Sequence, residues 1–294
     1  MVFLIGTVRS ALKSSFSRVV WRWGRIVAWL RTCFGRTLVL QDHRGLFYEI
    51  EYGEPFTELA GIPRSRREFT DDPEVLDFLE RVLIPGDVVV DLGASIGSIA
   101  LFAGRLVVNE GRVVAVEAEK TNFDQLSRNI VRNNLSSVES YHLAITDRGG
   151  EIAIHVFPRS HRGWNSIGRG EHGGPSPIGT ETVKCTTIDD LVDRLQIRRV
   201  DLLKIDVEGA EPEAFAGASR SLSNGSIRRI IFEISLGPLR GMDHEIDDVV
   251  RPLRAAGYTI RSIETGGNLT DVNEMTISQT KYANLVALAP GADD

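Results

Sequence analysis

The stretch that decides the fold is VVVDLGASIGSIALFA, residues 88–103. Its first residues form a short continuous apolar run, which is typical of a buried strand, and the run ends at Asp91. Gly93 and Gly97 follow in a turn, and an apolar helical segment comes next. Glycine lets the backbone approach a ligand closely and adopt positive φ, while the first turn of a helix offers unbonded N–H groups. The stretch therefore predicts a strand, a glycine turn and a helix that bind a nucleotide-like ligand.

Two carboxylates indicate the charge of that ligand. The spacing DxGxxxG differs from the GxGxxG of pyrophosphate-binding turns, and Asp91 before the glycines favours a cation. A second strand, GRVVAVEAE, ends with Glu117, which in this architecture can accept both hydroxyls of a ribose. Beyond a third strand, the segment HLAITD places Asp147 where it would reach an adenine amino group. We predict that the following residues bind the cofactor: Asp91, Gly93, Ala94, Gly97, Glu117 and Asp147.

These acids also have structural interpretations. Asp91 and Glu117 could simply cap helices, and Asp147 could be an ordinary turn aspartate. The occurrence of Asp91 and Glu117 at the ends of two successive strands favours the cofactor interpretation.

Outward from this motif, short apolar strands alternate with helices. The further strand segments are SVESYHLAI, VDLLKIDVEG, RRIIFEIS, YTIRSIET and YANLVALAP. Helices are expected over about 73–83, 211–222 and 243–256, with Asp72 as the N-cap of the first. This alternation predicts an α/β fold, a Rossmann-like seven-stranded sheet with helices on both faces.

One segment, residues 149–189, interrupts the alternation. EIAIHVFP and ETVKCTTI read as strands, and the glycine- and proline-rich span between them reads as a long loop. Loops of that length in a compact domain are often functional, so we expect a strand-loop-strand insertion that could cover the substrate. Asn165 and Ser166 are the candidate substrate-binding residues, while His155 and His161 are interpreted as ordinary strand and loop residues.

The composition limits the kinds of partner. The 294 residues carry a formal net charge of -6, which argues against a general nucleic-acid binder, because phosphate neutralisation needs excess Lys and Arg. The only cysteines, Cys33 and Cys185, form no CxxC pair, so neither a disulfide framework nor a zinc site is indicated. A small-molecule acceptor and a cytoplasmic location are the resulting expectations. Residues 37–85, a hairpin and helix, lead into a main domain over 86–290.

The first 36 residues form a distinct basic arm. No acidic residue precedes Asp42, and apolar residues recur at three- and four-residue steps over 16–34, which predicts an amphipathic helix. Arginines interrupt every apolar run, so the segment fits neither a transmembrane span nor a signal peptide. Residues 13–34 would lie on an anionic membrane surface, making the protein peripheral there, or bind an acidic protein partner. Packing of the helix on its own core is the alternative.

The most specific element is VDLLKIDVEGAEPEAFAGASRSL, residues 200–222. KIDVEGAE after a strand, following TTIDDL, resembles the FkbM-type methyltransferases, and DLGASIG and IIFEIS agree with this resemblance. The likeness covers about 85–235, and Ala118 departs from it where such proteins often have proline. It implies a class I methyltransferase fold, S-adenosylmethionine as the donor, and O-methylation of a hydroxyl on a sugar, lipid or polyketide-type natural product. The ammonium and sulfonium of that donor suit the carboxylate-first glycine turn.

The expected catalytic residues lie in KIDVEGAE. Asp206 follows the fourth core strand at the carboxyl edge where open α/β sheets bind ligands, and is the expected base or acceptor-orienting group. Lys204 shares its face of the strand, and Glu208 follows in the loop. Glu233 ends the next strand and is a candidate for contact with the acceptor. A salt bridge that merely fixes the loop is the structural alternative. Glu233 with Asp206 and Glu208 could instead bind a divalent cation, but no ligand spacing requires a metal ion, and none is predicted.

Three other functions compete with methyl transfer to oxygen. An NAD-type oxidoreductase would share the sheet, but the glycine pattern differs. A base-modifying N-methyltransferase would carry D/N-P-P-Y where this chain has KIDVEG. A catalytically idle protein could keep the fold for binding or scaffolding, although the retention of Asp91, Glu117, Asp206 and Glu208 disfavours it.

Overall fold

The computed structural model describes residues 37–51, 69, 72–108, 110–168, 174–272, 277 and 281–292. The chain divides into two compact units, Met1–Arg67 and Glu68–Asp294. The predicted basic arm of residues 1–36, including its amphipathic helix, lies outside the described residues, so its role stays a prediction. In the described part of the chain, no helix has the length and apolar character that crossing a membrane requires.

The first unit contains the predicted hairpin. Strands β1 (Thr37–Gln41) and β2 (Phe47–Glu51) pair antiparallel. The side chain of Asp42 accepts a hydrogen bond from the backbone N–H of Leu46 at 2.8 Å, and Gly45 adopts φ 91°. A carboxylate that bonds the backbone a few residues on stabilises a tight turn, which explains why the polar residues between the two alternating runs form one.

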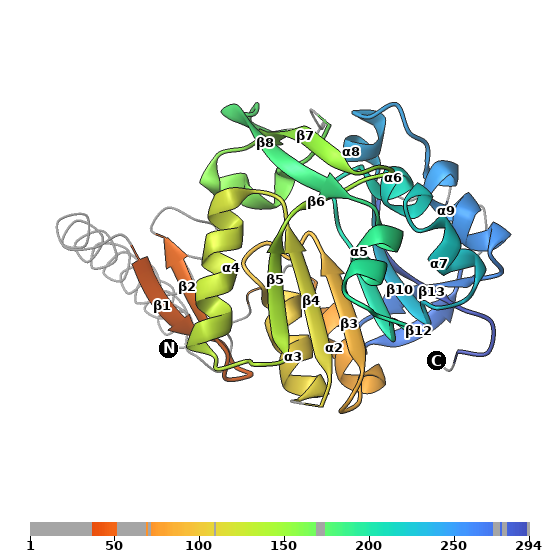
Figure 1. Ribbon diagram of the computed structural model, residues 1–294, viewed down its shortest axis with the longest axis horizontal. Helices are drawn as coiled ribbons and strands as arrows, with labels where there is room; N and C mark the ends of the chain where they lie inside the picture. The colour runs from red at the N-terminus through yellow and green to blue at the C-terminus, as the bar shows by residue number, and fades with distance from the viewer. Residues whose placement is uncertain are drawn as a thin grey trace, which may run out of the picture. The chain divides into compact units, whose positions relative to one another are not determined.

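The second unit is built on an eight-stranded mixed sheet (Figure 1). Its strand order is β12-β11-β13-β10-β9-β3-β4-β5, and β13 runs antiparallel to both of its neighbours. The strands are β3 (Val88–Leu92), β4 (Arg112–Glu117), β5 (Val138–His142), β9 (Leu202–Ile205), β10 (Arg229–Ser235), β11 (Thr259–Glu264), β12 (Asn268–Asp271) and β13 (Tyr282–Leu288). The sheet has one strand more than predicted, because β12, with the sequence NLTD, is a polar edge strand without an apolar run.

Alternate residues of the central strands face different layers. Leu92 of β3 and Ile205 of β9 belong to a core that includes side chains from α5, α6, α7 and α9. Successive strand residues point to opposite faces, so Asp91 and Lys204 face the other side of the sheet. Helix α3 packs against β3 and β4 there, and α2 packs on α3. The prediction of helices on both faces is confirmed, and the charged residues lie on the α2 and α3 side.

The helices lie close to the predicted ranges, with one break. They are α2 (Pro73–Val82), α3 (Ser98–Val107), α4 (Lys120–Arg132), α5 (Ile188–Arg194), α6 (Glu211–Ala216), α7 (Ser219–Ser223), α8 (Leu236–Arg240) and α9 (Ile246–Ala255). The single helix predicted over 211–222 is two helices. The break follows α6 at Gly217, where a Cβ would lie 2.4 Å from the carbonyl oxygen of Thr146. The backbone N–H of Asp189 donates to the carbonyl of Gly217 at 2.9 Å, which secures this close approach.

The insertion forms a small sheet of its own. Its strands β6 (Ala144–Ile145), β7 (Gly150–Val156) and β8 (Gly179–Thr186) lie in the order β6-β8-β7, and η3 (Arg159–Trp164) is a short 3₁₀ segment. The two strands predicted within 149–189 are confirmed. The third strand predicted for the main sheet is divided, because its last residues leave after β5 and pair with β8 as β6.

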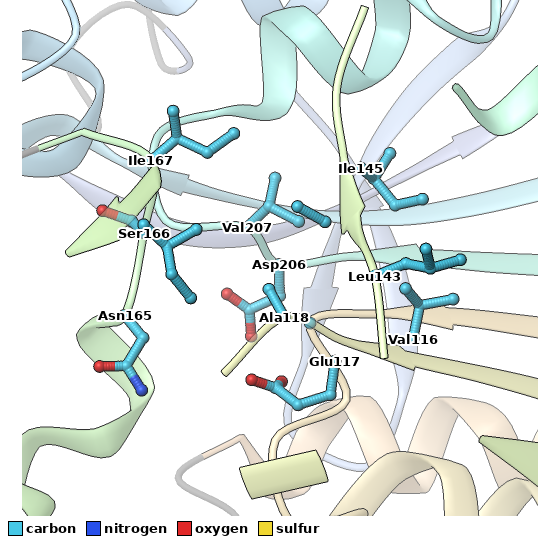
Figure 2. Close-up of a pocket in the computed structure, with 13 residues that line it drawn as sticks. Val116, Glu117, Ala118, Leu143, Ile145, Asn165, Ser166, Ile167, Asp206 and Val207 are labelled. Atoms are coloured by element: carbon cyan, nitrogen blue, oxygen red, sulfur yellow. The ribbon is translucent and has the colours of Figure 1, made fainter. Parts of the chain in front are cut away.

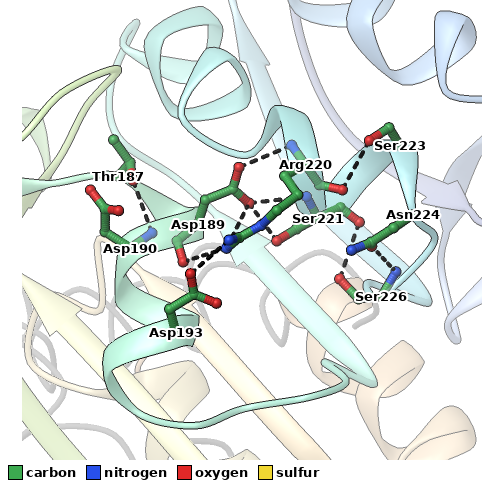
Figure 3. A network of polar contacts seen from close by, with 9 residues as sticks. All are labelled: Thr187, Asp189, Asp190, Asp193, Arg220, Ser221, Ser223, Asn224 and Ser226. Atoms are coloured by element: carbon green, nitrogen blue, oxygen red, sulfur yellow. Dashed lines mark hydrogen bonds and ion pairs between the residues drawn. The ribbon is translucent and has the colours of Figure 1, made fainter.

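A polar network joins α5 to α7 (Figure 3). The side chain of Asp189 accepts hydrogen bonds from the backbone N–H groups of Arg220 and Ser221, at 2.9 and 3.0 Å. Arg220 also donates to Asp193 at 2.7 Å. Asp189 therefore caps the first turn of α7 from a distant part of the chain. This contact gives the TTIDDL segment a structural role, since it fixes the helices that follow the KIDVEGAE loop.

Candidate active site

The glycine turn brings two strand ends together. Gly93 adopts φ 79°, and a Cβ at this position would lie 1.8 Å from the carbonyl oxygen of Asp206. Only glycine fits such an approach. The N–H groups of Gly93 and Ala94 donate to the carbonyl of Val116 at 3.0 and 2.9 Å. Gly97 adopts φ 101° at the start of α3. The turn is therefore held against the ends of both β4 and β9.

Asp91 is buried, and no described residue makes a hydrogen bond of standard geometry to it, although the backbone N–H of Ala100 in α3 lies near enough to favour its ionised form. Asp91 is 1% exposed, and neither carboxylate oxygen is satisfied. Burial raises the pKa of Asp91 to about 6, although the charge of Lys204 opposes the rise. A carboxylate in this state gains from a cation or a hydrogen-bond donor supplied by a ligand.

Glu117 connects the turn to the start of α4. One carboxylate oxygen accepts from the N–H of Ser95 at 2.8 Å, and the other accepts from the N–H of Glu119 at 2.9 Å. Burial raises the pKa of Glu117 to about 7, and these backbone hydrogen bonds limit the rise. The side-chain amide of Asn122 also lies 3.5 Å from Oε1, whereas Oε2 retains a further lone pair, so the fixed carboxylate can still accept a hydrogen bond from a ligand.

Glu117 and Asp206 meet in one pocket of about 440 Å³, a volume that includes space open to solvent. Figure 2 shows their carboxylates pointing into it, toward the side on which Asn165 and Ser166 lie. The lining residues are Gly93, Val116, Glu117, Ala118, Leu143, Ala144, Ile145, Ile154, Asn165, Ser166, Ile167, Asp206 and Val207. The structure thus brings together Gly93, Glu117, Asp206, Asn165 and Ser166 from the predicted site.

Asp147 lies apart from this group. Its side chain is 42% exposed, forms an ion pair with Arg148 at 3.1 Å, and does not line the pocket. The residues after β5 that do line it are Leu143, Ala144 and Ile145. They are apolar, so no charged residue in the sequence marked them as candidates.

The charged residues of the KIDVEGAE segment have two roles: Lys204 bonds Asp206 at the site, and Glu211 bonds the backbone of the loop. Lys204 donates to Asp206 Oδ2 at 2.7 Å. Burial alone would lower the pKa of Lys204, but the charges of Asp206 and Asp91 outweigh burial and raise it. Glu211, 2% exposed, accepts from the N–H groups of Val207 and Gly209, both at 3.1 Å. Glu211 thus shapes the loop, a role that no pattern in the sequence indicated.

Glu208 and Glu233 complete a cluster of carboxyl groups around Asp206. Glu208 has φ 53°, in the left-handed region that non-glycine residues seldom adopt. Burial and the charge of Asp206 raise the pKa of Glu208 well above its ordinary value and that of Glu233 to about 9. In the described part of the chain, no group of three or more His, Cys, Asp or Glu has an arrangement suited to a metal ion. The absence of a metal requirement stays a prediction.

A further polar corner lies beside Glu233. Asn284 on β13 pairs with Glu233 on β10. The side-chain amide of Asn284 and the hydroxyl of Tyr282 both donate to Oδ1 of Asp72, each at 2.7 Å. Asp72 occupies the N-cap position of α2 as predicted, but its side chain makes no capping hydrogen bond. This corner was not predicted from the sequence. It forms because antiparallel β13 starts at the carboxyl edge of the sheet, and the direction of a strand is not visible in the sequence.

The fold and the comparisons define the class of protein. A glycine turn after central strand β3, together with antiparallel β13 between β10 and β11, gives the class I methyltransferase fold. The chain belongs to the family described as the methyltransferase FkbM domain, which matches residues 91–260. This match confirms the resemblance seen in the sequence and, with it, S-adenosylmethionine as the cofactor.

Individual relatives are about a quarter identical to the chain over the residues that align. Hexuronic acid methyltransferase AglP of Haloferax volcanii is 26% identical over 171 residues, which span 58% of this chain and 65% of the relative. The 31-O-demethyl-FK506 methyltransferase FkbM of Streptomyces tacrolimicus is 27% identical over 202 residues, 60% of this chain and 75% of the relative. A crystal structure of methyltransferase FkbM from Methylobacillus flagellatus KT aligns with a TM-score of 0.43 at 15% identity, covering 72% of this chain and 50% of that chain.

Proposed function

We propose that the protein transfers a methyl group from S-adenosylmethionine to a hydroxyl of a small molecule, such as a sugar, lipid or polyketide-type natural product. The observation that carries this proposal is the meeting of Glu117 and Asp206 in one pocket at the Gly93 turn. In this proposal Glu117 binds the nucleoside part of the cofactor and Asp206 faces the acceptor.

The described residues fit the cofactor. S-adenosylmethionine supplies an electrophilic methyl group on a sulfonium, and it also carries an ammonium. Asp91, Asp206 and Lys204 together bring two carboxylates and one ammonium, which leaves a local negative charge for a cationic ligand. The unsatisfied carboxylate of Asp91 suits an ammonium group, and Glu117 suits the ribose hydroxyls. Gly93, Ala94 and Gly97 shape the turn. Asp147 is left out of this set because its side chain is 42% exposed and forms an ion pair with Arg148.

The acceptor end of the site is formed by Asp206 and its neighbours. Lys204 holds Oδ2 of Asp206, so Oδ1 is the oxygen available to accept the proton of an acceptor hydroxyl. Such a base contributes about 10²–10⁴-fold to a rate, and alignment of the hydroxyl contributes further. Burial and the charge of Asp206 raise the pKa of Glu233 to about 9, so Glu233 is protonated at neutral pH, and the same two causes raise the pKa of Glu208 and favour its protonated form. As neutral acids they can donate hydrogen bonds to other hydroxyls of the acceptor.

The first experiment separates cofactor binding from catalysis. Calorimetric titration with S-adenosylmethionine, with NAD as the comparison ligand, should show saturable binding of the former alone. Asp91→Ala should weaken that binding, whereas Asp206→Asn should retain it and lose turnover. Asp247→Asn, an exposed change on α9, serves as the control. Failure of the folded wild-type protein to bind S-adenosylmethionine would contradict the proposal.

The acceptor screen follows from the names of the relatives. One is a methyltransferase of hexuronic acid and another of 31-O-demethyl-FK506, so sugars and polyketide alcohols should be tried first, followed by lipids. Transfer of a radiolabelled methyl group reveals the product even in a mixture of many acceptors. Saturable cofactor binding without turnover on any acceptor would favour the idle binding or scaffold protein over the enzyme.

A further inference from the structure

A row of polar side chains follows the carboxyl edge of the sheet on the side of α2 and α3. Lys204 faces that side and bonds Asp206, and continuing the register of β9 and β10 by one position places Glu233 beside Asp206. Glu233 pairs with Asn284 on antiparallel β13, and residues paired directly across two strands share one face. Tyr282 precedes Asn284 by two residues and therefore lies on this face as well. The row thus crosses three neighbouring strands, β9, β10 and β13.

The hydroxyl of Tyr282 is fixed, while much of the residue stays exposed. The hydroxyl donates to Asp72 Oδ1 at 2.7 Å, and the amide of Asn284 donates to the same oxygen. Asp72 stands at the N-cap position of α2, yet its side chain makes no capping bond, so its carboxylate serves the tyrosine rather than the helix. Tyr282 nevertheless remains 53% exposed. An aromatic ring with a fixed end and a large exposed surface can support the apolar face of a ligand.

Carboxyl groups surround this ring. Partial burial and the charge of Glu233 raise the pKa of Tyr282, and the charges of Asp72 and Asp206 act in the same direction. The three carboxyl groups therefore lie close enough to the ring to contact one ligand together with it. Burial and the charge of Asp206 raise the pKa of Glu233 to about 9, so Glu233 can donate a hydrogen bond at neutral pH, whereas Asp206 can accept one.

These groups match the chemistry of a sugar ring. A pyranose has a face of C–H groups, which packs on an aromatic ring, and a rim of hydroxyls, which need both donors and acceptors. Neighbouring strands lie about 4.8 Å apart, so carboxyl groups on β9 and β10 can bond hydroxyls on adjacent carbons of one ring. An alcohol with a single hydroxyl would bond Asp206 alone and gain nothing from Glu233.

The charges of the corner favour an uncharged sugar. The nearby carboxylates of Asp72 and Asp206 would repel the carboxylate of a uronic acid, because like charges across an interface are unfavourable. Lys204 could attract such a group, but it already donates to Asp206 at 2.7 Å.

We propose that the polar corner beside Glu233 is the acceptor subsite, and that it binds an uncharged sugar ring with its C–H face on Tyr282. The reacting hydroxyl then lies at Asp206 and the neighbouring hydroxyl at Glu233. This inference rests on the proposed function and selects one acceptor class from it. Tyr282 determines specificity in this arrangement, since Asp206 meets the reacting oxygen.

The test compares two tyrosines whose hydroxyls both bond a carboxyl group. Tyr282 bonds Asp72, and Tyr141 bonds Glu139 on β5, which ends the strand order on the side away from β13. Transfer of a radiolabelled methyl group from S-adenosylmethionine should be measured on a panel of methyl hexopyranosides and methyl deoxyhexopyranosides, with cyclohexanol and dodecanol as comparisons. On the best sugar, Tyr282→Leu should raise the KM about 5- to 20-fold and change the kcat by less than about twofold. Tyr141→Leu should change the KM by less than about twofold.

A conservative variant distinguishes the ring from its hydroxyl. Tyr282→Phe keeps the ring and loses the bond to Asp72, so it should recover most of the acceptor affinity that Tyr282→Leu loses. Equal losses in the two variants would assign the effect to the bond with Asp72 and overturn the stacking role. The affinity for S-adenosylmethionine should be the same in the wild type and in all three variants.

The outcomes separate this inference from the proposed function. Methylation of cyclohexanol, dodecanol or another alcohol without methylation of any sugar would overturn the sugar subsite and leave the methyltransferase proposal standing. An unchanged KM of Tyr282→Leu would do the same, as would a higher kcat/KM for methyl glucopyranosiduronic acid than for methyl glucopyranoside. A wild type that does not bind S-adenosylmethionine would overturn both. If Tyr282→Leu does not fold, the preference of the wild type for methyl hexopyranosides over cyclohexanol decides.

Discussion

Replacing Glu233 with glutamine should stabilise the cofactor-free protein at neutral pH. Burial, with the charge of Asp206, raises the pKa of Glu233 from 4.5 to about 9. The same carboxyl group ionises near its ordinary pKa in the unfolded chain, so folding at neutral pH must return a proton to it. Neutral pH lies about two and a half units above the ordinary pKa of the carboxyl group. At about 1.4 kcal/mol for each unit, returning the proton costs about 3.5 kcal/mol. Partial solvent access and proton sharing with nearby carboxyls reduce the expected gain to about 2 kcal/mol.

The dependence on pH identifies the cause. A raised carboxyl pKa favours the folded state fully below 4.5, and this contribution is lost as the pH rises toward about 9. The advantage of Glu233→Gln should therefore be small near about pH 5 and increase by up to about 1.4 kcal/mol per unit above it. Urea unfolding followed by circular dichroism, without cofactor, measures the free energy of unfolding at each pH. Glu151→Gln, at an exposed position on β7, is the matched control.

If Glu233→Gln raised the free energy of unfolding by the same amount at every pH, this reasoning would be refuted. The expected gain comes from removing a group that must take up a proton on folding, so it has to depend on pH. A Glu233→Gln protein that is less stable than the wild type near about pH 8 would refute it as well. That result would mean that the ionised carboxylate makes favourable contacts in the fold.

Four further predictions concern other parts of the chain. Gly93→Ala should lower the free energy of unfolding by about 2–4 kcal/mol in urea, because the added Cβ meets the Asp206 carbonyl at positive φ; an unchanged stability would contradict this. Affinity for S-adenosylmethionine should fall as the pH drops through about 7 to 6, where Glu117 and Asp91 gain protons, and calorimetry across this range should not give a constant Kd. Asp189→Ala should cost about 1–2 kcal/mol of stability by uncapping α7, while a weakened cofactor affinity would count against its purely structural role. Removing residues 1–36 should reduce binding to anionic vesicles in a flotation assay; equal binding would exclude the arm as a membrane contact.

The central sheet could be predicted because its strands are apolar and short. Burial on both faces requires continuous apolar runs, and these runs are visible in the sequence. Asp91, Glu117 and Asp206 interrupt or end such runs, so their places at strand ends followed directly. The edge strand β12 lacks an apolar run, since its residues are mostly exposed, and nothing comparable in the sequence marks it as a strand.

Contacts between distant segments account for most of what the sequence did not reveal. The bonds from Tyr282 and Asn284 to Asp72 join residues 210 and 212 positions apart, and local patterns carry no information about such pairs. The close packing of Gly217 likewise involves the carbonyl of Thr146, a residue that follows β6 far earlier in the chain. The adenine contact at Asp147 stays a prediction, and the residues after β5 that line the pocket, Leu143, Ala144 and Ile145, are apolar and had no charged group to mark them.

The KIDVEGAE segment shows why a motif can be specific without every residue touching a ligand. Ile205 packs into the core, while Lys204 on the opposite face holds Asp206. Gly209 adopts φ 95°, and a Cβ there would lie 2.5 Å from the carbonyl oxygen of Pro238. Glu211 bonds the loop backbone. Most of these residues thus fix the position of a single carboxylate, Asp206. If Asp206 is the base, as proposed, conservative changes at Lys204 or Glu211 should therefore lower turnover with the cofactor still bound, because a displaced carboxylate loses its alignment with the acceptor.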